Sequence, residues 1–185
     1  MCYSSTLYIT LKKEYYPWPN LGPGSDAGIY SPAVVIFRDD LDRTCIDLPV
    51  DQRETVAVLT VAAPRLPEVL GGRFLNSSDL HDLREKIRLV YRMAGHNEKQ
   101  VLILGVYQPS ASCDLQPGTN LHVGAMGCGV YGCPPRQVAE EMKAVLFDEE
   151  FVGWFKEVVF AVYPAGRTGQ TNYDVFKEVF GASES

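Results

Sequence analysis

Residues 125–135 read Ala-Met-Gly-Cys-Gly-Val-Tyr-Gly-Cys-Pro-Pro and lie between an apolar segment and a predicted helix start. Closely spaced glycines let backbone N–H groups turn inward and approach a ligand. The N-terminus of the helix that follows adds free N–H donors and the positive end of a helix dipole. Together these features predict a pocket for a phosphate or diphosphate group. The spacing alone also fits a tight glycine turn that binds nothing.

Apolar runs and amphipathic segments alternate around this stretch, which predicts an α/β fold. The runs at 33–38 and 55–61 show no clean alternation, so both faces of these strands should be covered, as in a parallel or mixed sheet. Ligand sites in such sheets form at the carboxyl ends of strands, and the glycine stretch follows one of them. The long helix should be capped by Ser77, Ser78 or Asp79. Further strands are expected at 100–105 and 157–163, and helices at 4–13, 76–97, beyond 135 and at 172–180.

Composition limits the classes of function. The chain has 185 residues, of which 46% are hydrophobic and 22% charged, as expected for one globular domain with a core of its own. The net charge of −6 and the lack of a basic stripe argue against direct nucleic-acid binding. No apolar run reaches membrane-spanning length. Five irregularly spaced cysteines suit a reducing compartment, the cytoplasm or the nucleus.

Short motifs along nearly the whole chain occur in an order typical of one family. They lie at 5–8, 29–39, 61–64, 127–135 with 138–139, and 151–162, with Asn172 and Phe176 near the end. In this order and spacing the sequence resembles the microbial-type poly(ADP-ribose) glycohydrolases, a branch of the macrodomain superfamily. The resemblance implies one macrodomain-like domain over 1–185. Its expected architecture is a three-layer α/β/α sandwich with a mixed sheet.

The resemblance also implies a binding site, with no cofactor and no metal. The glycine loop would hold the diphosphate of ADP-ribose, and its tyrosine would lie against the ribose next to the scissile bond. The alternatives are a surface role for that tyrosine and ordinary strand packing for the aromatic residues on the adenosine side. The expected loop residues are Gly127, Cys128, Gly129, Val130, Tyr131 and Gly132, and the expected adenosine-side residues are Phe160, Tyr163 and Asn172.

Catalysis in the family that the sequence resembles needs a Gly-Gly-Gly turn followed by Gln-Glu-Glu, whose second glutamate is the general acid. This sequence contains neither motif. By the family pattern they would precede residues 2–8, so we expect a fold that is incomplete at its N-terminal end and no catalytic residue in the chain as written. The glycines at 71–72 are no substitute, because no Gln-Glu-Glu follows them. Glu140, Glu141 and the acidic residues at 148–150 are expected to face solvent.

The segment 106–124 departs from the family pattern, in which the preceding strand runs directly into the glycine motif. Removing it joins Gly105 to Ala125 and restores the expected junction. We favour the hypothesis that it is a retained intron. The alternative is a true surface insertion, which suits its content of Pro, Ser, Gly and Gln.

Two other kinds of site have weaker support in the sequence. A metal site at Cys128, Cys133 and His122 lacks a fourth ligand. A thiol nucleophile at Cys128 would need a basic partner, and the sequence places neither His81 nor His96 to serve.

Three hypotheses of function follow. The first is a domain that recognises ADP-ribose, poly(ADP-ribose) or ADP-ribosylated proteins without cleaving them. The second is a glycohydrolase that is active only in a longer form. The third is a degenerate or incorrectly assembled gene product that binds no ligand.

Overall fold

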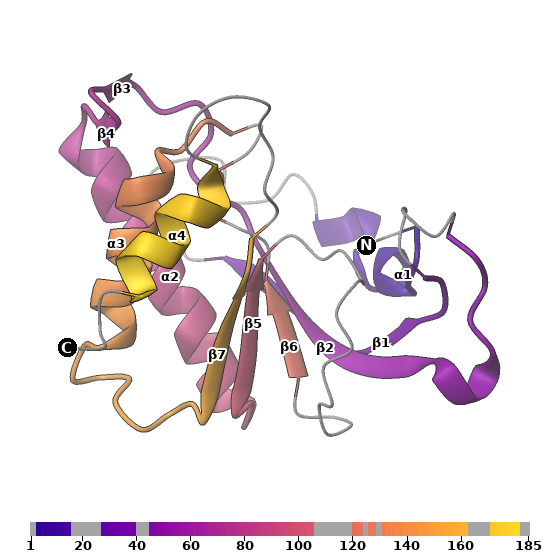
Figure 1. Ribbon diagram of the computed structural model, residues 1–185. Helices are drawn as coiled ribbons and strands as arrows, with labels where there is room; N and C mark the ends of the chain where they lie inside the picture. The colour runs from indigo at the N-terminus through magenta and orange to yellow at the C-terminus, as the bar shows by residue number, and fades with distance from the viewer. Residues whose placement is uncertain are drawn as a thin grey trace.

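A mixed five-stranded sheet forms the centre of the computed structural model, and its strand order is β1-β2-β6-β5-β7 (Figure 1). β1 (Gly28–Ile36) pairs antiparallel with β2 (Glu54–Val61), and the remaining neighbours are parallel. The other strands are β6 (Asn120–Val123), β5 (Val101–Gly105) and β7 (Glu157–Ala161). The structure describes residues 3–15, 27–39, 45–105, 120–123, 126–128, 131–162 and 171–181. The predicted α/β class with a mixed sheet is confirmed.

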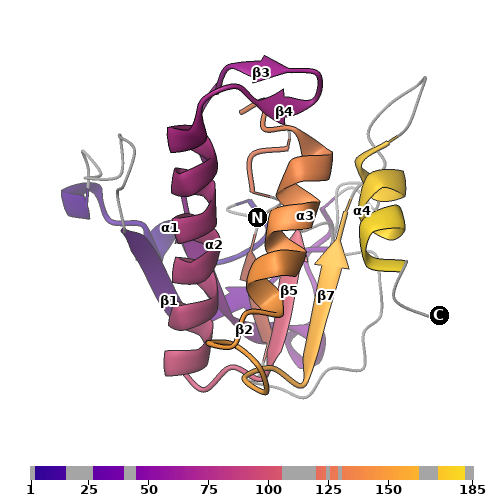
Figure 2. The ribbon, with the colours of Figure 1, turned by 90° about the vertical axis from the view of Figure 1, so that its left-hand side faces the viewer.

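Three helices cover one face of the sheet, and a short one lies on the other (Figures 1 and 2). The three are α2 (Ser77–His96), α3 (Pro135–Leu146) and α4 (Asn172–Gly181), and the short one is α1 (Leu7–Thr10). Side chains alternate along β2, because successive residues of a strand point to opposite faces. Ala57 and Leu59 join the large helix-side cluster, whereas Val56 and Val58 join a small cluster with Leu7 of α1.

The first strand begins earlier than its apolar run indicated. It starts at Gly28 rather than near residue 33, and its register with β2 shifts between Ser31 and Val34. Pro32 lies inside this irregular stretch. A proline has no N–H to donate to a ladder, so it is tolerated where the pairing is broken. The interruption hid the first half of the strand from an analysis based on apolar runs.

The predicted long helix is confirmed, but its predicted cap is not. α2 starts at Ser77 after Asn76, and no side chain there makes a capping hydrogen bond. Its buried face fixes it on the sheet instead, with Leu83, Ile87 and Tyr91 at most 1% exposed. Packing of an amphipathic face contributes more to such a helix than its ends do.

The last turn of α2 contains a glycine with a packing role. A Cβ atom at Gly95 would overlap the indole ring of Trp154, which lies in the turn after α3. That turn also contains Phe151, whose ring meets those of Tyr91 and Trp154 edge to face. The carboxyl end of α2 is thereby packed against residues far along the chain.

Ion pairs connect α2 with α3 and the turn that follows it. Arginines one helical turn apart on α2 reach carboxylates that we expected to face solvent. The pairs are Arg84–Glu141, Arg88–Asp148 and Arg92–Glu150. The expectation is wrong for Glu141, which is buried, whereas Glu140 is partly exposed and pairs with the exposed Arg73. Helix α3 packs against α2, so Glu141 lies at a helix–helix contact.

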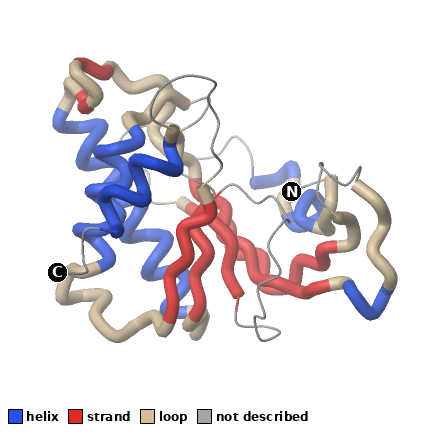
Figure 3. Tube along the Cα trace, viewed as in Figure 1, coloured by secondary structure: helices blue, strands red, loops and turns tan. Residues whose placement is uncertain are grey.

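Two features of the structure had no counterpart in the sequence analysis. β6 comes from the end of segment 106–124 and lies between β2 and β5, so part of that segment is a central strand (Figure 3). A small hairpin of β3 (Val69–Leu70) and β4 (Arg73–Phe74) precedes α2, and both glycines of its turn have positive φ. The remaining elements are two 3₁₀ turns at Lys13–Tyr15 and Val50–Gln52. No helix in the described ranges is long and apolar enough to cross a membrane.

Candidate functional site

The described part of the glycine stretch forms a closed turn at the start of α3. Gly127 and Gly132 have φ angles of 76° and 73°, a region that glycine adopts without strain. The N–H of Cys133 donates to the carbonyl of Gly127 over 3.0 Å and closes the turn. A Cβ at Gly127 would lie 2.6 Å from the Sγ of Cys133 and 2.9 Å from the Cβ of Ala63. Glycine at 127 is therefore required by both conformation and space.

The segment that follows β2 docks onto this turn. The Sγ–H of Cys133 donates to the carbonyl of Pro64 over 3.3 Å, and the N–H of Leu66 donates to the carbonyl of Tyr131 over 2.8 Å. Leu66 has a φ of 49°, which is uncommon for a residue with a side chain. Positive φ at such residues is often found at ligand sites. Residues 61–64 form one of the motifs of the resemblance, but no site role is predicted for this segment from the sequence. It follows a strand whose carboxyl end is expected at the same sheet edge.

Asn172 joins the site from the other end of the chain. Its Nδ2 donates to the carbonyl of Cys128 over 3.2 Å. Asn172 is the first residue of α4, and the preceding Thr171 exchanges hydrogen bonds with Asp174, which fixes the start of that helix. Cys128 and Asn172, both predicted as site residues, are in direct contact.

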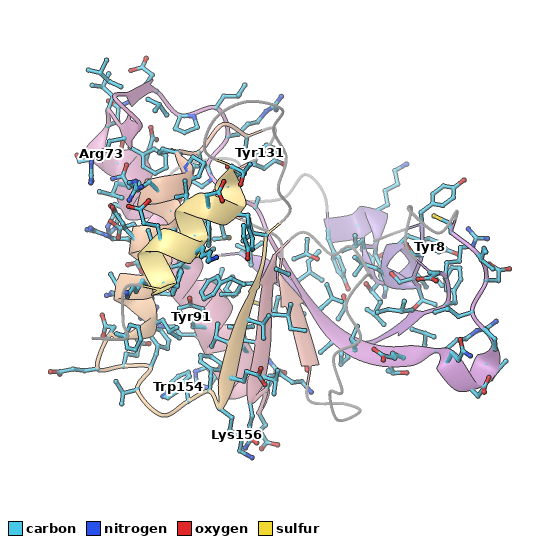
Figure 4. The ribbon with its side chains drawn as sticks, viewed as in Figure 1. Tyr8, Arg73, Tyr91, Tyr131, Trp154 and Lys156 are labelled. Carbon is cyan, nitrogen blue, oxygen red and sulfur yellow. The ribbon has the colours of Figure 1, made fainter. Side chains whose placement is uncertain are left out.

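The remaining predicted site residues differ in their surroundings. Tyr131 is 40% exposed and lies at the end of the molecule opposite Trp154 and Lys156 (Figure 4). The ring of Phe160 stacks on that of Phe180 with 4.0 Å between centroids, within the contact between β7 and α4. Such packing is the structural role considered for Phe160 as an alternative, and its role toward a ligand stays a prediction. Gly129, Val130 and Tyr163 lie outside the described residues.

Both cysteines of the turn are protonated at neutral pH. Burial raises the pKa of Cys128 to about 12, with a further contribution from the neighbouring Cys133. Burial, with the charges of Asp79 and Asp82, raises the pKa of Cys133 to about 11, against an opposing effect of Lys86. A thiol with so high a pKa is a poor nucleophile and metal ligand. Within the described ranges, no three potential metal-ligating side chains cluster together.

A buried ion pair lies on the helix behind the turn. The Nζ of Lys86 donates to the Oδ2 of Asp82 over 2.9 Å, and both side chains are less than 10% exposed. Both residues influence the pKa of Cys133, so the pair lies close to the glycine turn. The histidines considered as partners of a thiol nucleophile, His81 and His96, are both exposed on α2.

Comparison with solved structures identifies bacterial poly(ADP-ribose) glycohydrolases as similar. The enzyme from Deinococcus radiodurans in complex with ADP-ribose is 30% identical, with a TM-score of 0.72 over 98% of this chain and 66% of that chain. The enzyme from Thermomonospora curvata is 32% identical, with a TM-score of 0.72 over 96% of this chain and 57% of that chain. A second structure of the latter, bound to the inhibitor ADP-HPD, gives the same TM-score and identity.

These matches show which enzymes the chain is related to and how much of their length it covers. The chain is related to bacterial poly(ADP-ribose) glycohydrolases, shares their mixed α/β fold, and spans somewhat less than two thirds of their length. No family model and no curated protein matches the sequence.

Proposed function

We propose that this chain recognises ADP-ribose, free or as part of poly(ADP-ribose) or an ADP-ribosylated protein, and does not cleave it without further residues. The observation that carries the proposal is the closed glycine turn at the start of α3, joined to Asn172 by the hydrogen bond to Cys128. N–H groups at a helix start suit a diphosphate, and at α3 the first of them belongs to Arg136, because Pro134 and Pro135 have none. The related Deinococcus enzyme was crystallised with ADP-ribose.

The absence of a glutamate motif argues against cleavage. The sequence contains no Gln-Glu-Glu, and Glu140 and Glu141, which follow the turn on α3, are engaged by Arg73 and Arg84. Both carboxylates are thus engaged in ion pairs within the protein rather than presented to a ligand.

Isothermal titration with ADP-ribose tests the binding proposal. We expect saturable heat for the chain as written, and its absence at millimolar ligand would overturn the proposal. Gly127→Ala should abolish binding, because its Cβ would displace the Sγ of Cys133 and distort the turn. Gly153→Ala is the matched control: its φ is 81°, and a Cβ there meets no atom within 4 Å. It imposes similar backbone strain away from the turn and should bind as the unaltered chain does.

A second candidate function is hydrolysis by a longer form of the protein. It is favoured by the solved relatives, which are glycohydrolases and extend well beyond the part that this chain matches. We expect no release of ADP-ribose from poly(ADP-ribose) by the chain as written. An in-frame Gly-Gly-Gly and Gln-Glu-Glu in the genomic DNA upstream of Met1 would identify the longer hydrolase.

A further inference from the structure

A buried amide on the first turn of α3 anchors a segment from another part of the chain. Gln137 is 5% exposed, and its Oε1 accepts a hydrogen bond of 2.7 Å from the backbone N–H of Phe74 in β4. Polar side chains are retained in the interior where they have such a partner, because an unpaired polar group there is costly. This hydrogen bond fixes the β3–β4 hairpin beside the start of α3, where Figure 2 shows it.

The same residue belongs to the helix start that follows the glycine turn. The N–H of Val138 donates to the carbonyl of Pro134 over 3.0 Å. Arg136 and Gln137 contribute the backbone N–H groups that lie before this bond, and such groups at a helix start are suited to an anion. Gln137 therefore contributes a backbone N–H to the helix start and, through its side chain, holds the hairpin next to it.

Residues 63–76, which we call the connecting segment, join β2 to α2 and contact the glycine turn near their beginning. The thiol of Cys133 donates to the carbonyl of Pro64, and the N–H of Leu66 donates to the carbonyl of Tyr131. Leu66 makes this contact with a φ of 49°. A residue with a side chain keeps such a conformation only when its surroundings hold it there. The far end of the connecting segment must therefore be held as well.

A second contact with α3 at that far end is weaker. Arg73 pairs with Glu140 over 3.2 Å, but the arginine side chain is 63% exposed, and solvent weakens such a pair. The N–H of Phe74 is partly buried and would lose its acceptor if the amide of Gln137 were removed. Gln137 is therefore the stronger of these two anchors.

We propose that Gln137 is a positioning residue of the candidate site. Through Phe74 it holds the connecting segment on the glycine turn and thereby sets the affinity of the turn for ADP-ribose. The inference rests on the proposed recognition of ADP-ribose. It adds a side chain that acts through the connecting segment rather than by touching the ligand.

The test combines isothermal titration with ADP-ribose and hydrogen–deuterium exchange of the Leu66 amide. Gln137→Met keeps the length of the side chain and removes the acceptor. We expect about tenfold weaker binding, the effect of losing one buried hydrogen bond, and about tenfold faster exchange at Leu66. Should this variant not fold, Gln137→Asn shortens the side chain by one methylene and should change both quantities in the same direction.

The matched control removes another buried hydrogen bond to the same helix. The hydroxyl of Tyr91 donates to the carbonyl of Met142, further along α3 from the turn. Tyr91→Phe deletes this bond and keeps the ring. It should change the affinity for ADP-ribose and the exchange of the Leu66 amide by less than about twofold, because the connecting segment keeps its anchor.

A double variant tests whether the anchor acts through the backbone of Leu66. Glycine adopts positive φ without strain, so Leu66→Gly should make the contact with the turn depend less on Gln137. Adding Gln137→Met to Leu66→Gly should weaken binding by about threefold or less, against about tenfold in the unaltered background. An equal loss in both backgrounds would overturn the inference.

The remaining outcomes separate the inference from the proposed function. If Gln137→Met binds ADP-ribose as the unaltered chain does, or if Tyr91→Phe weakens binding equally, the inference is overturned and the proposed function stands. If the unaltered chain binds no ADP-ribose, the proposed function fails, and the exchange at Leu66 decides the inference. Unchanged exchange in Gln137→Met overturns it, and faster exchange supports the hold of Gln137 on the turn.

Discussion

The helix-backed part of the molecule and the part formed by α1, β1 and the face of β2 that carries Val56 and Val58 differ in how they are held together. The first has a continuous cluster of buried side chains from three helices and the sheet, and the second has a small one around Leu7, Val34 and Val56. Met126 and Cys133 of the glycine turn belong to the larger cluster. The candidate site is thus built on the better-packed part, and it should keep its shape when the other part is weakened.

Strand β6 connects the two parts, so the largest effect is expected from its removal. It pairs with Ala57 and Val58 of β2 on one side and with Val101–Leu104 of β5 on the other. Deleting 106–124 should abolish cooperative unfolding, a loss comparable to a domain's whole stability of about 5–15 kcal/mol. Urea denaturation followed by circular dichroism measures this.

A shorter deletion provides the control for that experiment. Replacing 107–118 with a Gly-Ser linker retains β6 and should keep the cooperative transition. If the complete deletion is as stable as the control, the segment is dispensable, as the retained-intron hypothesis allows. Spliced transcripts that keep the segment throughout would contradict that hypothesis independently.

The next largest effect concerns the buried ion pair in the helix-backed part. Lys86→Met leaves the carboxylate of Asp82 buried without its ammonium partner and should lower the free energy of unfolding by about 3–5 kcal/mol. Replacing both residues in Lys86→Met/Asp82→Leu should restore most of that loss, because no uncompensated charge remains. Chemical denaturation of the unaltered chain, the two single variants and the double variant measures the coupling free energy between the two residues. A double variant less stable than Lys86→Met would contradict the explanation.

The same substitution in both parts compares their packing directly. Leu83 is 0% exposed in the large cluster and Leu7 is 6% exposed in the small one. Leu83→Ala should lower the free energy of unfolding by about 4 kcal/mol. Leu7→Ala should lower it by about 2 kcal/mol, because the residues around the small cluster can move into the space that the side chain leaves. Thermal and urea unfolding give both values. Affinity for ADP-ribose should be unchanged in Leu7→Ala, and a tenfold loss there would show that the two parts are coupled.

The smallest effect is expected at the surface of the helix-backed part. Arg73 and Glu140 pair over 3.2 Å with side chains 63% and 38% exposed. Arg73→Gln should reduce stability by less than about 1 kcal/mol, because solvent and salt screen such a pair. Urea denaturation at low and at high salt measures this change in the free energy of unfolding. A larger cost that persists at high salt would show that Arg73 has a packing role in the β3–β4 hairpin.

The sequence predicted what depends on local pattern. Helix α2 and the strands β2, β5 and β7 follow from apolar spacing within each segment. Burial of Glu141 depends on how α3 packs on α2, and β6 depends on pairing with strands distant in sequence; neither leaves a local signal. The proximity of Cys128 and Asn172 came from the family resemblance. The docking of Leu66 needed the sheet order, which periodicity does not provide.

The residue types allowed at positions 95 and 154 depend on each other, because Gly95 packs against the ring of Trp154. Almost any change at Gly95 would introduce a Cβ into the space of the indole, and loss of the indole would leave a void against α2. A substitution at only one of the two positions should lower stability, so related sequences should either keep both residues or replace both together. The pair offers a marker of common descent that is independent of the ligand site, and it would persist in relatives that no longer bind any ligand.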